Sequence, residues 1–471
     1  MKKWSQSTQA LMLLVVVFTL GSCAVGPNYK APVVQAPLAF RGDTAPSETE
    51  SLADRKWSSL FEDEALTELV ETALKQNFDL RIAAERVLQA RAELGAQGAA
   101  QFPNLNAVGQ FSALRNSQVG ANRFLPKGTN IDVAYTQAGG SLSWELDLWG
   151  RIRRLKEAAR AQYIASEEAR RGVITSLVAD VTTGYFSLRE LDLELDIARK
   201  TRGIAENGLR LTQMRKEQGV ATALDVRQAE QLVYLSTAQI AASERAIALQ
   251  ENALSVLLGR SPGEIRRGKP LEAFTTPARI PAGLPSSLLT RRPDIRQAEQ
   301  TLIAANARIG AARAEYFPQI TLTGLMGGQS RPLTDLFTGP ARQWAFIPAA
   351  TLPIFNAGRI RNNVRFSEAV QRESLAGYEQ AVQSAFREVS DALAAYSKTG
   401  EQRQQQELLV SALRHSNELS MLRYKGGLDS FLQVLDAQRS QFQGELALAQ
   451  LRREELLAVV QLYRALGGGW Q

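Results

Sequence analysis

Two residue types that carry much of enzyme chemistry each occur once in this chain, as Cys23 and His415. A hydrolytic triad needs a histidine beside a nucleophile, and a metal centre needs several ligands together. A disulfide, zinc ribbon or iron–sulfur cluster needs more than one cysteine. His415 lies in the middle of a helix-forming stretch, which is typical of an exposed or interhelical structural histidine. The sequence therefore predicts a protein that is not an enzyme and that holds no metal and no soluble cofactor.

Cys23 ends a segment with the three parts of an export signal. Two lysines form its cationic start, residues 10–20 its apolar run, and Leu20-Gly21-Ser22-Cys23 its small-residue exit. This run is too short to span a bilayer of about 30 Å as a helix. Because the ending resembles a bacterial lipobox, we expect residues 1–22 to be a lipoprotein signal peptide and Cys23 to be acylated. An ordinary signal peptide with an incidental cysteine is the alternative. Ala24, in place of an aspartate, favours the outer membrane.

The composition is that of a folded protein with a mixed surface. Of the 471 residues, 45% are hydrophobic and 22% are charged, which excludes disorder and collagen. The formal net charge is +7, and it falls to +5 once the two lysines of the signal are removed. So mild an excess, spread over so long a chain, indicates a solvated surface and no nucleic-acid partner.

The mature sequence consists of two related halves. Residues 79–83 recur as 294–298 at an offset of 215, and residues 150–153 recur as 358–361 at an offset of 208. A proline-rich link separates the halves. We therefore expect an N-terminal extended segment, a first repeat, a link and a second repeat, at residues 23–60, 61–260, 261–293 and 294–471.

Each repeat contains a segment with the two-residue period of a β-hairpin. The clearest strand alternates apolar Leu142, Trp144, Leu146 and Leu148 with polar Ser141, Ser143, Glu145 and Asp147. The hairpins are predicted at about 103–148 and about 318–355, and the last strand is the weakest because Pro348 and Pro353 lack a hydrogen-bond donor. A sandwich face is one interpretation. An apolar-out, polar-in pattern also suits an outer-membrane β-barrel, which four strands could close only as several copies.

Helices make up the larger part of both repeats. We expect a helix near residues 62–101, and long proline-free helices from Gly150 to about Gln218 and from Gly358 to about Gly426. At 1.5 Å per residue, each of the long helices would measure roughly 100 Å. Return helices follow, with apolar residues every seven positions that favour coiled-coil packing. These positions are Val226, Val233, Ile240, Ile247 and Leu254 in the first repeat, and Leu435, Phe442, Ala449, Leu456 and Tyr463 in the second.

Together with the lipobox and the duplication, four short motifs carry a family resemblance. They are Val25-Gly26-Pro27-Asn28-Tyr29, Leu284-Pro285-Ser286-Ser287-Leu288-Leu289 running into Arg291-Arg292-Pro293-Asp294-Ile295, Phe317-Pro318, and Leu352-Pro353-Ile354-Phe355. The sequence resembles the TolC-like outer-membrane factors, closest to the NodT-type lipoprotein subfamily that is paired with RND-type drug efflux pumps. The resemblance implies a mainly α-helical homotrimer. Its chains would contribute four strands each to a twelve-stranded membrane β-barrel, continued by a long periplasmic α-helical barrel of coiled coils.

The resemblance also assigns the two helical turns. Gly219-Val220-Ala221-Thr222 and Gly427-Leu428-Asp429-Ser430 match the family's tip motif, where the helical hairpin of a periplasmic adaptor protein docks. The expected docking residues are Gly219, Val220, Thr222, Gly427, Leu428 and Ser430. A glycine suits such a turn for an independent reason, because reversing a helix within a few residues needs a positive φ or a close backbone approach. Taken alone, each glycine would be an ordinary helix C-cap.

A candidate gate lies just beyond the second turn. Leu432 and Asp436 are four residues apart and share one helix face. In the implied trimer, three leucines would exclude water by dewetting and three aspartates would recruit cations. Tyr424 and Asp225 match further tip residues that tie inner helices to outer ones. Asp429 departs from the family's alternatives, some of which have arginine, so a salt bridge there is open. A solvated coiled-coil face is the alternative for Asp436.

The resulting functional hypothesis is a passive exit channel in the outer membrane, lipid-anchored and extending into the periplasm. Its partners would be an adaptor (membrane fusion) protein, an inner-membrane RND pump and outer-membrane lipid, and its cargo drugs or other small toxic compounds. Three alternatives remain: export of metal ions or oligosaccharides through the same architecture, a structural coiled-coil lipoprotein bridging outer membrane and cell wall, and a periplasmic adaptor. The structural lipoprotein does not explain the four alternating strands, and an adaptor would have one helical hairpin and not two. Four aromatic residues could lie at membrane interfaces or pack a junction: Trp144, Trp149, Trp344 and Phe346.

Overall fold

The computed structural model describes residues 24–34, 36–37, 39–42, 51–115, 117, 126, 132–276 and 281–469. The predicted signal peptide and Cys23 lie outside this part of the chain. The described residues form two compact units, each of which takes segments from both repeats. Unit 1 comprises residues up to 32, 87–165 and 298–378, and unit 2 comprises 33–86, 166–297 and 379–471. Among the described residues, none of the helices combines the length and apolar character needed to cross a bilayer.

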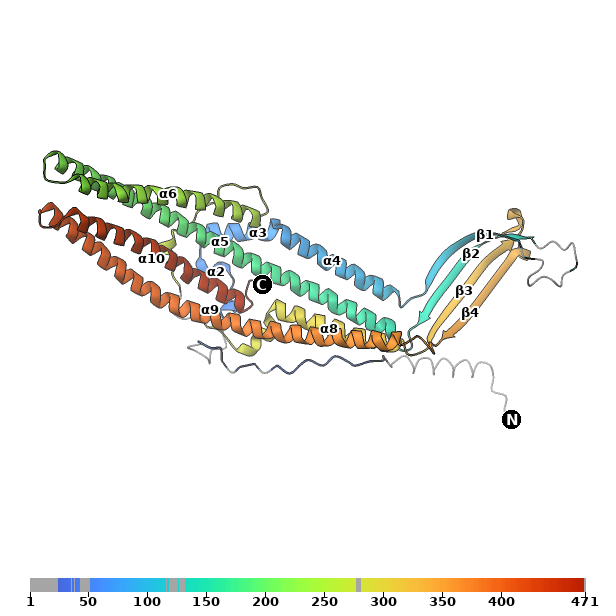
Figure 1. Ribbon diagram of the computed structural model, residues 1–471. Coiled ribbons are helices and arrows are strands. Elements are labelled where there is room, and N and C mark those ends of the chain that lie inside the picture. The colour runs from blue at the N-terminus through green and yellow to red at the C-terminus, as the bar shows by residue number, and fades with distance from the viewer. Residues whose placement is uncertain are drawn as a thin grey trace. The chain divides into compact units, whose positions relative to one another are not determined.

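Unit 1 contains a four-stranded antiparallel sheet in the order β1-β2-β3-β4 (Figure 1). Its strands are β1 (Asn104–Arg115), β2 (Asp132–Leu146), β3 (Gln319–Ser330) and β4 (Arg342–Thr351). Strand β4, which contains Pro348, is the shortest of the four, and β1 and β4 are the two outer strands. The two predicted hairpins therefore join side by side in one sheet.

The register of the sheet places the predicted apolar residues on one face. Directly paired residues have their side chains on the same face of a sheet. Leu105 pairs with Leu142, Leu142 with Gly324, and Gly324 with Phe346. Along the same face, Trp144 pairs with Leu322, and Met326 pairs with Trp344. The opposite face is mostly polar, with rows such as Gln110, Gln137 and Gln329.

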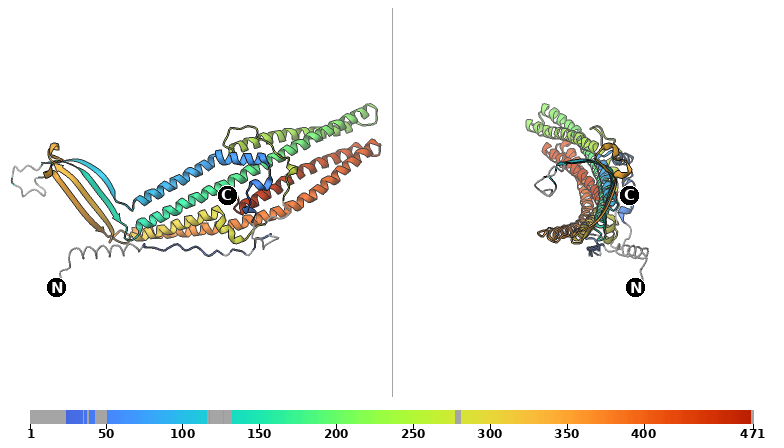
Figure 2. Two further views of the ribbon diagram at one scale, coloured as in Figure 1. Left: turned by 180° about the vertical axis from the view of Figure 1, so that it is seen from behind. Right: turned by 90° about the vertical axis from the view of Figure 1, so that its right-hand side faces the viewer.

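Two long helical hairpins follow the strand pairs. Helices α5 (Arg151–Glu217) and α9 (Arg359–Lys425) have 67 residues each, and their return helices α6 (Ala223–Leu257) and α10 (Phe431–Ala465) have 35 each. Neither long helix contains a proline, so nothing interrupts the hydrogen-bond ladder. Within unit 2 the two hairpins lie side by side (Figures 1 and 2). Helix α8 (Pro293–Ala314) precedes β3 as α4 (Phe78–Ala99) precedes β1.

The expected single helix near residues 62–101 is wrong, because the chain breaks at Asn77. Helix α3 (Glu64–Gln76) ends there and α4 begins one residue later. The buried Asn77 side chain accepts a hydrogen bond from the Leu80 N–H at 3.0 Å, which caps α4, and donates one to the Leu257 carbonyl at 2.9 Å. Asparagine is among the strongest N-cap residues, so at this position it favours the start of a new helix over the continuation of α3. Two four-residue helices complete the fold, α2 (Ser58–Phe61) and α7 (Leu288–Arg291).

The core of unit 2 is built on aromatic and aliphatic side chains of α3, α5, α6 and α10. Phe186 of α5 is fully buried, and its ring meets those of Phe61 and Phe274 edge-on at 4.8 and 5.2 Å. Small residues such as Ser236 and Ser243 of α6 are buried where helices approach closely. Burying this much apolar surface stabilises the helices more than their intrinsic propensity does.

The Arg291-Arg292-Pro293-Asp294 motif forms a joint within unit 2. The buried Arg292 side chain donates hydrogen bonds to both carboxylate oxygens of Asp294, at 3.0 and 2.6 Å, and to Glu388 of α9 at 2.7 Å. It also donates to the Ala465 carbonyl at the end of α10, at 2.9 Å. One guanidinium thus ties the link, α9 and α10 together, which suits the fixed, planar donor geometry of arginine.

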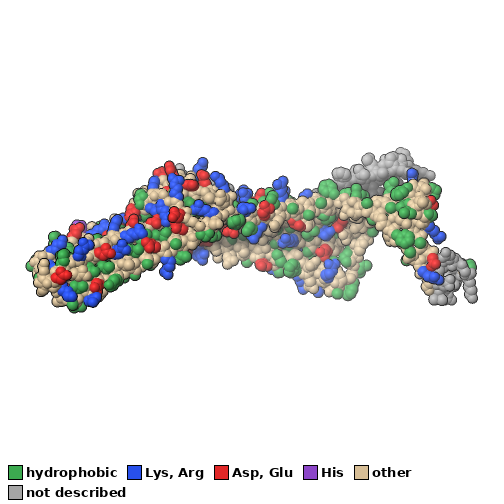
Figure 3. Space-filling view, turned by 90° about the horizontal axis from the view of Figure 1, so that it is seen from above, with side chains coloured by type: hydrophobic (Ala, Val, Ile, Leu, Met, Phe, Trp, Pro, Cys, Tyr) green, Lys and Arg blue, Asp and Glu red, His purple; other side chains and the backbone are tan. Residues whose placement is uncertain are grey.

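Charged side chains of both signs are mixed over the helices. On the face shown in Figure 3, Lys and Arg alternate with Asp and Glu along the helical part, and charges are sparse over the sheet. Many are paired along a helix face, as Arg227 is with Glu230 at 2.8 Å. A surface of this kind is solvated without presenting a stripe of one sign.

Candidate functional site

The two helical turns have the same backbone geometry. In each, the glycine is left-handed, with φ of +78° at Gly219 and +73° at Gly427. The next N–H donates to the carbonyl five residues back, from Val220 to Arg215 and from Leu428 to Arg423, both at 2.9 Å. Both turns also have the shorter bond from the glycine N–H to the carbonyl three residues back. This pattern is the Schellman motif, in which glycine avoids the penalty of a positive φ.

Both turns expose large apolar side chains at equivalent positions. Val220 is 62% exposed and Leu224 64%, and their counterparts at an offset of 208, Leu428 and Leu432, are 71% and 51% exposed. Val220 and Leu428 lie in the turns themselves, and Leu224 and Leu432 lie in the first turn of the helix that follows. Each tip therefore exposes two large apolar side chains, which we name its apolar patch.

The first turn is closed by a capping box at the start of α6. The Asp225 N–H donates to the Thr222 hydroxyl at 3.2 Å, and the Thr222 N–H donates to the Asp225 carboxylate at 2.7 Å. The Thr222 hydroxyl donates to the same carboxylate at 2.8 Å. Two N–H groups left over at the helix start are thus satisfied. Asp225, expected to tie the inner helices to the outer ones, is engaged in the cap of its own helix.

The second turn is held differently. At the start of α10, the Ser430 side chain makes no capping hydrogen bond. Asp429 instead accepts two hydrogen bonds from Arg423, at 2.6 and 3.0 Å. These bonds hold the pKa of Asp429 below its ordinary value of 3.8, despite a smaller opposing contribution from burial. The salt bridge left open at Asp429 is therefore formed with a residue of the same chain.

Tyr424 lies beneath the second turn in a cluster that joins the two hairpins. Its side chain is 5% exposed, its ring meets Phe431 of α10 edge-on at 5.3 Å, and the Arg215 guanidinium of α5 lies 4.6 Å from the ring centre. A cation over an aromatic face is attracted by the ring's quadrupole. The surrounding buried residues come from both hairpins: Ala205, Ala229, Leu232, Val434 and Leu435.

Two polar atoms in this cluster have no hydrogen-bond partner among the described residues. They are the Tyr424 hydroxyl oxygen and the Arg215 Nε, and both are buried. A buried donor left without a partner costs free energy comparable to a lost hydrogen bond. The Tyr424 hydroxyl and the Arg215 Nε are therefore buried without a hydrogen bond from the described part of the chain.

Leu432 and Asp436 both face outward on α10. Asp436 is exposed, and within the described part of the chain its carboxylate makes no hydrogen bond or ion pair. Their neighbours Val434, Leu435 and Ala437 are buried, so the exposed face is narrow. The structure thus brings the two predicted gate residues together on one surface, and it does not bond Tyr424 to Asp225.

Sequence reasoning missed four residues around this site. Arg215, Arg423 and Phe431 were overlooked because their roles come from contacts with a neighbouring turn or helix. Leu224 could have been found, since the offset of 208 that relates the two halves places it opposite Leu432.

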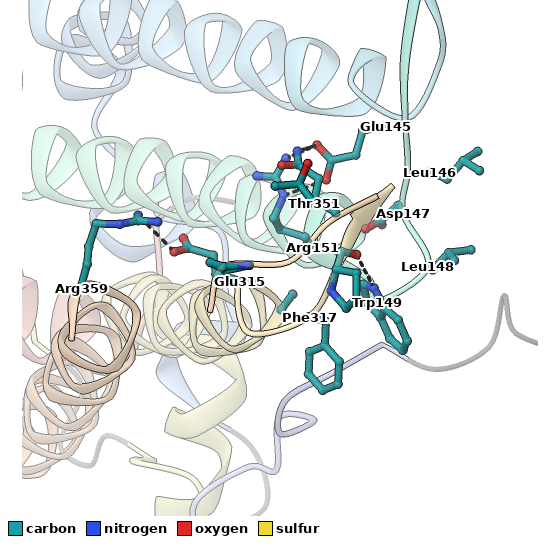
Figure 4. Close-up of a pocket in the computed structure, with 14 residues that line it drawn as sticks. Glu145, Leu146, Asp147, Leu148, Trp149, Arg151, Glu315, Phe317, Thr351 and Arg359 are labelled. Atoms are coloured by element: carbon teal, nitrogen blue, oxygen red, sulfur yellow. Dashed lines mark hydrogen bonds and ion pairs between the residues drawn. The ribbon is translucent and has the colours of Figure 1, made fainter. Parts of the chain in front are cut away.

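A second candidate site is a cavity of about 380 Å³ in unit 1, where the sheet meets the helices (Figure 4). Glu145 at the end of β2 accepts hydrogen bonds from Arg151 at 2.9 and 2.7 Å and from Gln319 at 2.6 Å. Across the cavity, Arg359 pairs with Glu315 at 3.6 Å. These charged groups are paired with one another. They therefore connect the ends of the strands to the helices, and none of them is a free reactive group.

Two of the four aromatic residues, Trp144 and Trp149, pack against the chain at the predicted junction. The Trp149 indole N–H donates to the Pro318 carbonyl at 2.8 Å, and its ring stacks on Phe317 at 4.8 Å (Figure 4). The Trp144 indole N–H donates to the Gln101 carbonyl at 3.0 Å. These two tryptophans pack the junction. Trp344 and Phe346, in contrast, are 79% and 58% exposed on the apolar face of the sheet.

The described residues hold no group of three or more His, Cys, Asp and Glu side chains placed to bind a metal ion. What the tips offer instead is an apolar surface, a narrow exposed face with a leucine and an aspartate, and one ion pair. Such groups can bind a partner or control the passage of solutes.

Residues 69–260 and 284–468 match the protein family described as outer membrane efflux protein. The antibiotic efflux pump outer membrane protein ArpC of Pseudomonas putida is 41% identical over 467 residues, which cover 98% of this chain and 95% of that protein. The toluene efflux pump outer membrane protein TtgC of Pseudomonas putida has the same identity and the same coverage. Among solved structures, the open state of the Neisseria gonorrhoeae MtrE outer membrane channel is 34% identical, with a TM-score of 0.85 over 95% of this chain and 99% of that one.

Proposed function

Because the chain belongs to the outer membrane efflux protein family, we propose that it is the passive exit channel of a tripartite efflux system in the outer membrane. The energy for transport would come from an inner-membrane RND pump, joined to the channel by a periplasmic adaptor. Related proteins are named for efflux of antibiotics and of toluene, so the proposed cargo is small toxic compounds, with the pump selecting among them.

The sheet is the observation that carries this proposal. Within the described residues, β1 and β4 each leave one edge unpaired, while one face of the sheet is lined with apolar side chains. Unpaired backbone groups cannot remain exposed to lipid, so a membrane sheet must close on itself. Four strands are too few to close a pore in one chain. Three copies would give a barrel of about twelve strands with a polar interior.

The tips support the same function at the other end of the hairpins. Six apolar patches per trimer, two on each chain, would receive the helical hairpins of the adaptor through Val220, Leu224, Leu428 and Leu432. Leu432 also borders the pore in this proposal, with Asp436 one turn further along α10. In the resting trimer the three leucines would approach one another and exclude water, and docking would draw them apart.

Cys23 is proposed to carry the membrane anchor. The residue lies outside the described part of the chain, and the support for this assignment is its position at the end of the signal segment in Leu20-Gly21-Ser22-Cys23. Several acyl chains on one residue would hold the chain stably in the outer membrane.

Planar-bilayer recording of the purified full-length protein tests the channel directly. We expect a small single-channel conductance for the wild type and a conductance several times larger for the double variant Leu432→Ala, Asp436→Ala. Removing the leucines widens the constriction, and removing the aspartates abolishes a ring of charge that binds cations.

The internal repeat supplies a matched control for this experiment. Leu224→Ala, Gln228→Ala changes the equivalent positions of α6 and should leave the conductance low. An equal rise in both double variants would place the gate elsewhere in the tip. Complete absence of conductance from protein that has inserted into the bilayer would refute the channel.

A further inference from the structure

A short segment at the start of the described chain is bound in a groove of unit 1. Residues 25–29, which we name the strap, lie across α5 and α8. The Val25 N–H donates to the Trp149 carbonyl at 3.0 Å, Asn306 of α8 donates to the Pro27 carbonyl at 3.0 Å, and the Tyr29 hydroxyl donates to Glu299 of α8 at 3.1 Å. The strap therefore joins the first turns of α5 to α8, which belong to different repeats.

Arg154 makes most of the side-chain hydrogen bonds to the strap. Its side chain is 5% exposed, and its Nε donates to the Val25 carbonyl at 3.3 Å. One terminal nitrogen donates to the Asn28 side chain at 2.7 Å and to the Gly26 carbonyl at 3.4 Å, and the other pairs with Glu157 at 2.8 Å. A buried guanidinium needs all its donors satisfied, and the strap supplies most of the acceptors here.

Two glycines let the strap approach α8 at backbone contact. Gly26 is left-handed, with φ of +100°, and a Cβ on it would lie 2.4 Å from the Gly310 Cα. A Cβ on Gly310 would lie 2.7 Å from the Val25 carbonyl oxygen and 2.9 Å from atoms of Arg154. Any side chain at either position would push the strap out of the groove.

The internal repeat shows that this groove is specific to one half of the chain. At the offset of 208 the counterpart of Arg154 is Asn362 on α9, and at the offset of 215 the counterpart of Gly310 is Gly95 on α4. A Cβ on Gly95 would meet nothing within 4 Å. The glycine of α8 is thus in contact with the strap, and its duplicate on α4 is in open space.

From these contacts we propose that Arg154 and Gly310 form a receptor groove for the strap, which would join the proposed lipid anchor to α5 and α8. Ala24 lies against Gly150, where a Cβ would be 2.8 Å from the Ala24 Cα. The role as an anchor rests on the proposed acylation of Cys23, whereas the groove does not.

Hydrogen exchange of the full-length protein in detergent tests the groove. We expect the Val25 amide, whose N–H donates to the Trp149 carbonyl, to exchange slowly in the wild type and about tenfold faster or more in Gly310→Ala and in Arg154→Met, because each change removes or displaces hydrogen bonds of the strap. Gly95→Ala is the matched control and should exchange like the wild type. Since alanine is the stronger helix former, neither glycine variant should weaken its helix.

Two further comparisons separate the groove from the anchor. If Gly310→Ala and Gly95→Ala exchange at the same rate in the strap, the receptor groove is refuted, whether or not Arg154→Met folds. Intact-mass measurement of protein from the membrane reports acylation of Cys23 independently. In Cys23→Ala the strap should stay protected, because the groove binds backbone and side chains of residues 25–29. Loss of protection there would mean that the lipid orders the strap, and would overturn the proposal.

Discussion

Arg423 and Asp429 form a two-bond ion pair across the turn that precedes α10, with Gly427 between them in the chain. The first turn has no such pair, since Ala221 stands where the second has Asp429, and Arg215, the counterpart of Arg423, lies over the Tyr424 ring instead. The same backbone motif is thus held by a capping box in one repeat and by an ion pair in the other.

Removing this ion pair should loosen the second tip. Asp429→Asn is expected to raise the resting conductance modestly. The effect should be small because an exposed ion pair contributes little free energy to stability and is screened by salt. The pKa of Asp429 is depressed below 3.8, so the pair is fully present above that pH and is lost as the pH falls through the depressed value. Wild-type conductance should therefore rise in acid below pH 3.8, while that of Asp429→Asn should not.

The control for this pH effect is Asp196→Asn, which removes an exposed carboxylate in the middle of α5. Its conductance should follow the wild type at every pH and salt concentration. Were Asp196→Asn to abolish the acid response as well, the response would reflect general charge and not the Arg423–Asp429 pair.

Acid should also weaken the joint at Arg292. Burial by itself raises the pKa of Asp294, but hydrogen bonds from Arg292 and its positive charge outweigh burial and hold the pKa below 3.8. The folded state therefore gains stability from this carboxylate above pH 3.8 and loses it as the pH falls through the lower value. In thermal unfolding followed by circular dichroism, Asp294→Asn should be less stable than the wild type at neutral pH. The difference should shrink in acid, and a constant difference would contradict this assignment.

Leu224 should act in docking and not in gating. Its side chain is exposed, so Leu224→Asp should leave the fold and the resting conductance unchanged while placing a charge on the apolar patch of the first tip. Antibiotic resistance of the source strain, deleted for this chain and complemented in trans, should fall. The control Gln231→Asp adds the same charge roughly 10 Å further along α6 and should preserve resistance. Equal loss in both would point to a general effect of charge on the helix.

The break at Asn77 should matter for stability. Asn77→Ala removes the cap of α4 and the hydrogen bond to Leu257, and we expect a cost of about 1–3 kcal/mol, seen as a lower midpoint of thermal unfolding. Asn207→Ala, at an exposed position within α5, is the matched control and should be neutral or slightly stabilising. A midpoint unchanged by Asn77→Ala would mean that the cap is not needed.

The sheet and the long hairpins were readable from the sequence because their signals are repeated many times. Alternation over eight residues around Trp144 specifies which side chains share a face, and a one-residue slip would have reversed all of them. Long runs without proline, ended by glycine, similarly specify α5 and α9. Because the chain is duplicated, the pattern that predicts each element occurs twice in the sequence.

Features that depend on one residue or on one tertiary contact could not be predicted from the sequence. A single Asn77 between two helix-forming stretches carries no more signal than any other asparagine, and its effect comes from a carbonyl 180 residues away. Arg215 is an ordinary basic residue near a helix end until the fold brings Tyr424 beneath it. The partner of Asp429 was overlooked because Asp429 was compared with the same position in relatives and not with Arg423, six residues earlier.

The offset of 208 between the tips also has an evolutionary consequence. A duplicated turn gives each copy freedom to change while the other keeps its role, and the acidic residue of the exposed α10 face illustrates this: Asp436 has Gln228 as its counterpart on α6. A trimer therefore carries three carboxylates at this level, whereas an aspartate in both copies would give six. Crowding six like charges would raise their mutual repulsion and force some to bind protons. The two copies thus differ in charge at this level while they keep the same turn geometry.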